Sequence, residues 1–196
     1  MAAGPVFLVS SVIQGSARSG FDFSRNAFSQ LSLGDLGWIQ IATFLMTGAL
    51  TIAGASGIAS ALRSTRNGRR IAQLIAVYGA SLLAAGVFTA DPGEGFPSGA
   101  PQDAGTLSTH GLVHLASASV GFLALCAAFV LLGRHFHRYG RVAWALPCYV
   151  VPAFTVAGIS ASATTIVAFT VGAGIAILWL TAVSSRLRSD LTDHLS

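Results

Sequence analysis

Charged residues are scarce in this sequence, and lysine is absent altogether. Asp, Glu, Lys and Arg make up 9% of the 196 residues, whereas 53% of the residues are hydrophobic. A soluble domain usually carries about a quarter charged residues because its surface faces water. A chain this poor in charge buries most of its surface in lipid, which excludes an ordinary soluble domain.

Cysteine is also scarce, and the usual catalytic motifs are missing. The two cysteines, Cys126 and Cys148, lie in the middle of different apolar segments, so neither a disulfide framework nor a CxxC metal site is indicated. The sequence has no Gly-x-Ser-x-Gly, no Gly-x-x-x-x-Gly-Lys phosphate loop and no dinucleotide fingerprint. No motif therefore identifies a reaction, and the cofactor stays undetermined.

Long uncharged apolar runs dominate the chain instead. Crossing the hydrocarbon layer as a helix takes about 20 residues, whereas barrel strands would show short alternating segments. The runs are continuous, so we predict an all-α fold, a polytopic transmembrane six-helix bundle that forms a single domain over residues 1–196. The predicted spans are about 2–17, 38–62, 71–90, 110–133, 142–160 and 165–185.

The first predicted span is the shortest. Residues 2–17 are uncharged and would form a helix of roughly 25 Å. The alternative is a signal peptide cleaved after Ala17, because Gly15-Ser16-Ala17 resembles a small-residue cleavage site. No Lys or Arg precedes the apolar stretch, which favours a retained span.

The distribution of arginine predicts the orientation. If six spans are drawn, Arg18 and Arg25 fall on one side of the membrane and the other arginines fall on the opposite side. The positive-inside rule assigns the larger group to the cytoplasm. We therefore predict a multi-pass membrane protein with both the N- and C-termini cytoplasmic. The arginines sit in short loops that flank the spans and have no aromatic platform between them, which argues against nucleic acid as a partner despite the net charge of +4.

The first of two long outer loops, residues 18–37, is not merely polar. Phenylalanine and leucine alternate in it with serine and aspartate. We expect a short amphipathic helix capped by Asp22 or Ser24. Phe28 and Leu31 should then be buried against the bundle.

Three ionisable residues flank the second long outer loop, residues 91–109. His110 and His114 are four positions apart at the start of the fourth span and share one helical face, and Asp91 ends the third span directly across the loop. A carboxylate at a helix C-terminus opposes the helix dipole, and a histidine could supply the compensating partner. We predict a contact between Asp91 and at least one histidine, and we treat all three as candidate catalytic residues.

Three interpretations of this cluster stay open. It could be a structural polar cluster, a site for a small molecule or lipid headgroup with acid–base capacity, or a metal site with these side chains as ligands. The His-x-x-x-His spacing is common, and Gly111 stands where a zinc protease has its glutamate, so we assign no metal ligand. Haem is disfavoured because His135 and His137 lie at the opposite end of the same span.

The same segments resemble a known family. Residues 21–25 read Phe-Asp-Phe-Ser-Arg, residues 29–40 read Ser-Gln-Leu-Ser-Leu-Gly-Asp-Leu-Gly-Trp-Ile-Gln, and residues 86–92 read Gly-Val-Phe-Thr-Ala-Asp-Pro before His110-Gly111-x-x-His114. In this order they resemble the bacterial membrane family catalogued as domain of unknown function 998, over nearly the whole chain. The resemblance implies a six-span bundle and brings no established activity. Family members usually carry more residues before the first span.

We expect a membrane protein that binds a lipid or another hydrophobic small molecule in an extracytoplasmic-side pocket. The candidate ligand-binding residues are Ser24, Arg25, Ser29, Ser32, Trp38 and Gln40. One alternative is an intramembrane enzyme, a metal-dependent hydrolase or an acid–base cyclase, that uses Asp91, His110 and His114. The other is a structural membrane subunit. Membrane lipid and the small molecule are the expected partners, and a homo-oligomer is also open.

Overall fold

The described part of the chain forms six α-helices and one short 3-10 helix. The computed structural model describes residues 2–103, 106–162 and 164–193, and no β-strand occurs within these ranges. The elements are α1 (Ala3–Ala17), η1 (Phe28–Ser32), α2 (Gly37–Ala61), α3 (Gly68–Val87), α4 (Thr109–Arg138), α5 (Val142–Ala161) and α6 (Ile166–Asp193). Helices α2 to α6 are each long and apolar enough to cross a membrane, and α1 is a shorter apolar helix. The predicted all-α six-helix membrane bundle is confirmed.

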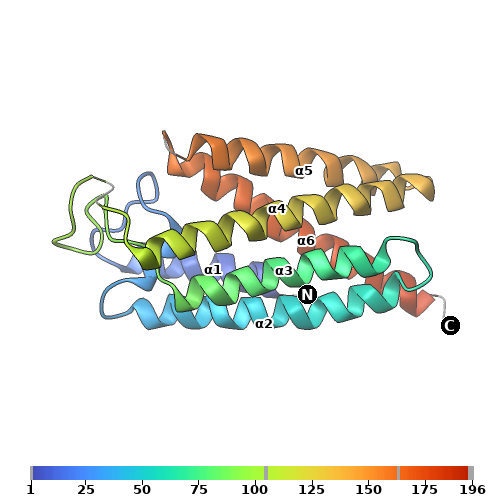
Figure 1. Ribbon diagram of the computed structural model, residues 1–196, viewed down its shortest axis with the longest axis horizontal. Helices are drawn as coiled ribbons and strands as arrows, with labels where there is room; N and C mark the ends of the chain where they lie inside the picture. Colours follow the sequence, from blue (N-terminus) through green and yellow to red (C-terminus); the bar gives the residue numbers. More distant parts are fainter. Residues whose placement is uncertain (1, 104–105, 163, 194–196) are drawn as a thin grey trace.

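The helices follow one another around the bundle. Each helix packs against the next along the chain, and α6 packs back against α1 and α2. Figure 1 shows an elongated bundle whose helices run along its long axis, with loops gathered at two ends. We call these the long-loop end, formed by residues 18–36, 88–103, 106–108, 162 and 164–165, and the arginine end, formed by residues 62–67 and 139–141.

Helix α1 occupies only the half of the bundle next to the long-loop end. A Cβ added at Gly4, near its start, would meet Ile177 and Thr181, which lie midway along α6. Figure 1 accordingly shows the N-terminus beside the middle of the bundle. This helix therefore contributes to the interior at the long-loop end.

Two helices extend beyond the apolar runs from which their spans were predicted. Helix α4 continues to Arg138 and α6 continues to Asp193. Hydropathy identifies the part of a helix that lipid covers. Backbone hydrogen bonds can extend the same helix beyond the lipid, into the aqueous region. Charged residues at these ends therefore lengthen the helices without changing the order of the spans.

Glycines bring α2 and α3 into close contact. A Cβ at Gly48 would lie 2.7 Å from the carbonyl oxygen of Gly79, and a Cβ at Gly79 would lie 2.9 Å from the carbonyl oxygen of Gly48. Only glycine permits this approach of two backbones, which is how membrane helices gain packing contacts. Gly57, which also lies on α2, has no neighbouring atom within 4 Å and faces outward.

A buried polar network joins α1 to α2. The Gln14 side-chain amide donates to Gln40 Oε1 at 2.8 Å, and the Gln40 amide donates to the Ser11 hydroxyl at 3.1 Å. Gln40 is fully buried in this interface. Its predicted role in ligand binding does not fit this position, because the neighbouring helix already satisfies its amide.

Candidate functional site

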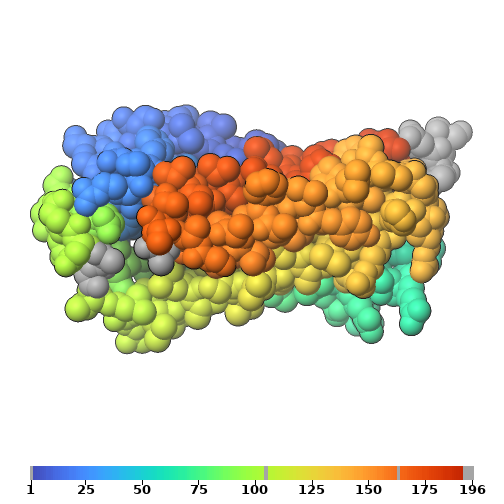
Figure 2. Space-filling view, turned by 90° about the horizontal axis from the view of Figure 1, so that it is seen from above, coloured from blue at the N-terminus to red at the C-terminus, as the bar shows by residue number. Residues whose placement is uncertain are grey.

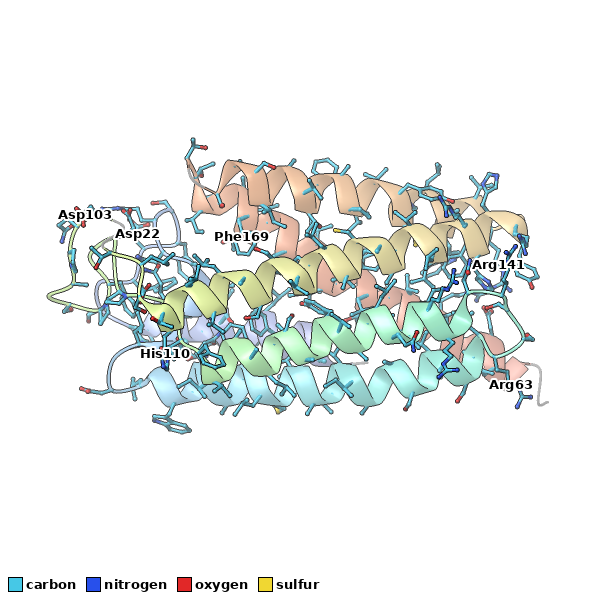
Figure 3. All side chains as sticks on the ribbon, viewed as in Figure 1. Asp22, Arg63, Asp103, His110, Arg141 and Phe169 are labelled. Atoms are coloured by element: carbon cyan, nitrogen blue, oxygen red, sulfur yellow. The ribbon has the colours of Figure 1, made fainter. Side chains whose placement is uncertain are left out.

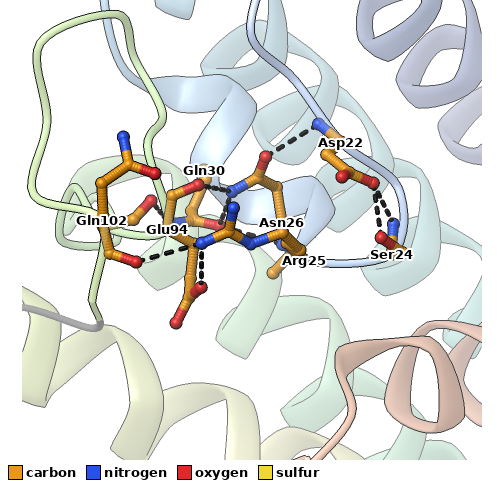
Figure 4. A network of polar contacts seen from close by, with 9 residues as sticks. Asp22, Ser24, Arg25, Asn26, Gln30, Glu94 and Gln102 are labelled. Atoms are coloured by element: carbon orange, nitrogen blue, oxygen red, sulfur yellow. Dashed lines mark hydrogen bonds and ion pairs between the residues drawn. The ribbon is translucent and has the colours of Figure 1, made fainter.

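The two long loops fold together over the long-loop end. Arg25 forms an ion pair with Glu94 at 3.1 Å and donates to the carbonyl of Gln102 at 3.0 Å. Asn26 donates to the carbonyl of Glu94 at 3.3 Å, and Gln30 donates to that of Gly93 at 3.1 Å. Figure 4 shows this network, and Figure 2 shows the two loops, blue and yellow-green, side by side at one end of the molecule. The loops therefore form one polar cover.

The first loop docks on the bundle through its predicted apolar residues. Leu31 is fully buried in η1, and Phe28 is partly buried against the core. The helix begins at Phe28 and is a 3-10 helix, so neither Asp22 nor Ser24 caps it. Instead, the Asp22 carboxylate accepts from the Ser24 backbone N–H at 2.8 Å and from the Ser24 hydroxyl at 2.6 Å, which closes a local turn.

Arg18 fastens the first loop to the second. Its guanidinium donates to the carbonyls of Leu31 and Leu33 and lies 4.8 Å from the centre of the Phe96 ring. Burial lowers the pKa of Arg18, and the nearby Asp35 partly offsets that shift. The guanidinium stays charged at neutral pH, because an arginine titrates far above it.

Asp91 holds Ser108, the residue that caps the following helix. Its carboxylate accepts from the backbone N–H of Ser108 at 2.8 Å and from the Ser108 hydroxyl at 2.5 Å. The same hydroxyl accepts from the N–H of Gly111 at 3.0 Å, and a Cβ at Gly111 would collide with the carboxylate at 1.9 Å. The expected partner for Asp91 was a histidine, but the positive end of the α4 dipole takes that role.

The two histidines lie in different environments. His114 is 4% exposed and donates from Nδ1 to the carbonyl oxygen of Phe88 at 2.8 Å, which leaves Nε2 as the acceptor of the neutral ring. His110 is exposed, and its ring meets Phe88 edge-on. Within the described residues no three His, Cys, Asp or Glu side chains are grouped closely enough to hold a metal ion. The metal-site interpretation of Asp91, His110 and His114 therefore has no support in the geometry.

An apolar cavity of about 330 Å³ lies inside the bundle at the long-loop end. Side chains from α1, η1, α2, α3, α4, α5 and α6 line it. Its aromatic wall contains Phe122 and Phe169, whose ring centroids are 5.6 Å apart, and Phe169 projects between α6 and α4 in Figure 3. A cavity of this size and character is typical of sites for hydrophobic small molecules.

A second cavity of about 550 Å³, whose lining is more polar than that of the first, adjoins it beneath the loops. Arg25, Asp91 and Glu94 line it with backbone and hydroxyl groups. The two cavities share six lining residues: Ala27, Ser29, His114, Leu115, Ser162 and Ile166. His114 therefore stands where an apolar interior meets a polar entrance.

One residue that lines the apolar cavity has a buried, unused hydrogen-bonding group. Tyr78, in the middle of α3, is 2% exposed and lines the cavity, and its hydroxyl has no hydrogen-bond partner among the described residues. A buried hydroxyl without a partner is costly, so native proteins seldom leave one.

The candidate ligand-binding residues do not all reach these cavities. Ser24 and Arg25 line the polar cavity, and Ser29 lines both. Ser32 is buried and donates to the carbonyl of Ser29 at 2.6 Å, and Trp38 is 65% exposed on the outside of the bundle. Sequence reasoning missed Tyr78, although a tyrosine in the middle of an apolar span is itself a signal for a polar partner.

The fold and these cavities define a multi-pass helical membrane protein with an apolar cavity under a polar cover. The family described as "Protein of unknown function (DUF998)" matches residues 1–186, so the chain belongs to that family. No curated protein and no solved structure matches the chain.

Proposed function

We propose that this protein binds an amphiphilic lipid or a similar hydrophobic small molecule at the long-loop end. The observation that carries the proposal is the continuity of an apolar cavity with a polar one through His114. A ligand with a hydrocarbon part and a polar part matches that division. The hydrocarbon part would lie among Leu82, Phe122 and Phe169. Binding there would remove the apolar surface of the ligand from water or from lipid headgroups.

Two polar groups are available to orient such a ligand. Nε2 of His114 is an acceptor at the junction of the cavities, because Nδ1 is committed to the carbonyl of Phe88. The Tyr78 hydroxyl lies deeper and has no partner. A few convergent polar groups in a largely apolar pocket are what fixes the orientation of a bound small molecule.

The cavity lining suggests a route from the membrane. Leu115 is 54% exposed and lines both cavities, and Ser119 and Ser162 are exposed lining residues on α4 and just after α5. Two other lining residues, Leu82 and Phe122, are buried. This difference in exposure supports an opening of the cavity between α4 and the α5–α6 pair, on a side of the bundle that lipid covers. An apolar ligand could then enter without crossing water.

We further propose that the protein lies in a bacterial inner membrane with the arginine end in the cytoplasm, which places the cavities on the extracytoplasmic side. The charge bias of the loops supports this orientation. Reporter fusions after Ser196 and within residues 91–109 should indicate opposite sides of the membrane. A C-terminal reporter active outside the cell would reverse the orientation.

A matched pair of glycine variants tests the proposed binding. A Cβ at Gly174 would meet only Leu8, at 3.8 Å, so Gly174→Leu fills the cavity without a backbone clash, whereas Gly57→Leu adds the same side chain to an outward face. Titration of detergent-purified protein with a dansyl-labelled fatty acid should show affinity reduced by about tenfold or more in Gly174→Leu only, on the order of 1.4 kcal/mol or more. Equal binding by both variants and the wild type would reject the cavity as the site.

A further inference from the structure

A cavity at the arginine end has four arginines among its lining residues. It has a volume of about 440 Å³ and lies between the α2–α3 loop and the end of α4. Its charged and polar lining includes Arg66, Asn67, Arg70, Arg134, Arg138 and Tyr139. In Figure 3 nitrogen-bearing side chains gather at this end, around Arg141 and Arg63.

Acidic side chains do not neutralise this cavity. Among the described residues, the ion pairs at the arginine end are Arg141 with Asp190 and Arg186 with Asp190 at 3.0 Å. Asp190 lines the neighbouring cavity and not this one. The four arginines that line the cavity form no ion pair with any described residue, so their charges add.

The start of α3 adds to the positive potential. Asn67 precedes the helix and lines the cavity, but its side chain does not cap the first turn. Unbonded backbone N–H groups and the helix dipole make such a terminus attractive to an anion. Arg70 lies in the first turn of the same helix, and Arg134 and Arg138 share one face of α4.

Orientation of the spans alone does not require this arrangement. The positive-inside effect depends on the number of arginines near the span ends and not on their convergence around one hollow. Arg63 and Arg69 serve that purpose equally well and do not line the cavity. The exposed Tyr139 at the rim is typical of an aromatic side chain at the headgroup level of a membrane.

We infer that this cavity binds a phosphate group, either that of an anionic lipid headgroup or free inorganic phosphate. Arginine suits this role because its planar guanidinium donates two parallel hydrogen bonds to phosphate oxygens. Several guanidiniums around one hollow can share the anion, as basic pockets beside membrane helices do for lipid headgroups. The site is separate from the proposed amphiphile cavity, at the opposite end of the bundle.

Two double variants of equal charge test this inference. Arg70→Gln with Arg134→Gln removes two lining arginines, and Arg63→Gln with Arg69→Gln removes two that do not line the cavity. Each protein is reconstituted in nanodiscs of phosphatidylcholine with phosphatidylglycerol, and the lipid retained after detergent extraction is identified by native mass spectrometry. Thermal unfolding in detergent with inorganic phosphate, against chloride at equal ionic strength, tests the free anion.

The outcomes separate the two sources of phosphate. A headgroup site is supported if the wild type retains phosphatidylglycerol, the lining pair retains about tenfold less, and the control pair retains as much as the wild type. Stabilisation by inorganic phosphate, lost only in the lining pair, supports a site for the free anion. Equal loss of lipid or of phosphate stabilisation in both pairs would show a general effect of charge. A wild type that neither retains phosphatidylglycerol nor is stabilised by phosphate would show that the cavity is not a phosphate site. Either of these last two results overturns the inference.

Discussion

The Asp91 carboxylate bonds to both the backbone N–H and the hydroxyl of Ser108, at 2.8 and 2.5 Å, and so ties the loop after α3 to the start of α4. Asp91→Ala and Ser108→Ala should each lower stability by about 0.5–2 kcal/mol, the usual effect of losing an N-cap. The double variant should cost less than the sum, because the two residues share one contact. Thermal unfolding in detergent measures all three.

His110→Ala is the control for that interpretation. His110 is exposed, and its substitution should change stability by less than about 0.5 kcal/mol. A His110→Ala variant as unstable as Asp91→Ala would instead show that the carboxylate depends on the histidine, as the sequence had suggested.

The Arg18 guanidinium should matter more to stability than the Arg25 ion pair. Arg18→Ala leaves the carbonyls of Leu31 and Leu33 without their donor, which costs about 1–3 kcal/mol. Arg25 and Glu94 are largely exposed, and such pairs contribute about 0–1 kcal/mol. Denaturation of the two variants under identical conditions gives the comparison. Equal losses would mean that the Arg18 guanidinium stabilises the loops no more than the Arg25 ion pair does.

Asp22 should titrate below an ordinary aspartate. The hydrogen bonds from the Ser24 side chain and backbone, together with the charge of Arg25, lower the pKa of Asp22 in the folded protein. The stabilisation of the local turn by the Asp22 carboxylate is therefore complete above the unfolded pKa of about 3.9. It is lost as the pH falls through the lower pKa of the folded protein. Ser24→Ala should raise the pKa of Asp22, as followed by NMR titration of the carboxyl carbon. Ser19→Ala, in the same loop, should leave it unchanged, and an equal shift in both would refute the assignment to Ser24.

Tyr78→Phe separates ligand binding from folding. Removing a buried hydroxyl that has no partner should leave the ligand-free protein as stable as the wild type or more stable. The same change should weaken binding of a dansyl-labelled fatty acid several-fold, because the ligand loses a hydrogen bond. A variant that is destabilised without ligand would show that the hydroxyl serves the fold, and unchanged affinity would remove it from the site.

The sequence predicted the fold because lipid imposes a simple rule on composition: spans must be long, apolar and helical. It did not predict the Gln14–Gln40 bond, although Gln14 in the first span was a visible partner for a second polar residue inside the membrane. Nor did it predict the bonds of Asp91 to Ser108, since it considered only charged partners and not the N–H groups at the start of the next helix.

The apolar cavity could not have been predicted from any local pattern. Phe7, Tyr78, Phe122 and Phe169 come from four helices spread over most of the chain, and only their packing shows that they surround a space. The arginines at the other end were visible in the sequence as an orientation signal. Their convergence around one hollow depends on how α3 and α4 pack, which the sequence alone does not give.

Photocrosslinking tests the central claim most directly. A fatty acid with a diazirine near the end of its chain would be added to the protein in nanodiscs, and the sample would be irradiated. Peptide mass spectrometry would then identify the crosslinked residues. The proposed function predicts crosslinks at the cavity residues Phe122, Phe169 and Ile177, which excess unlabelled fatty acid suppresses. Crosslinks confined to outward-facing residues of the same helices, Leu123, Val171 and Leu178, would mean that the probe contacts the protein only as bulk lipid and would contradict the proposal.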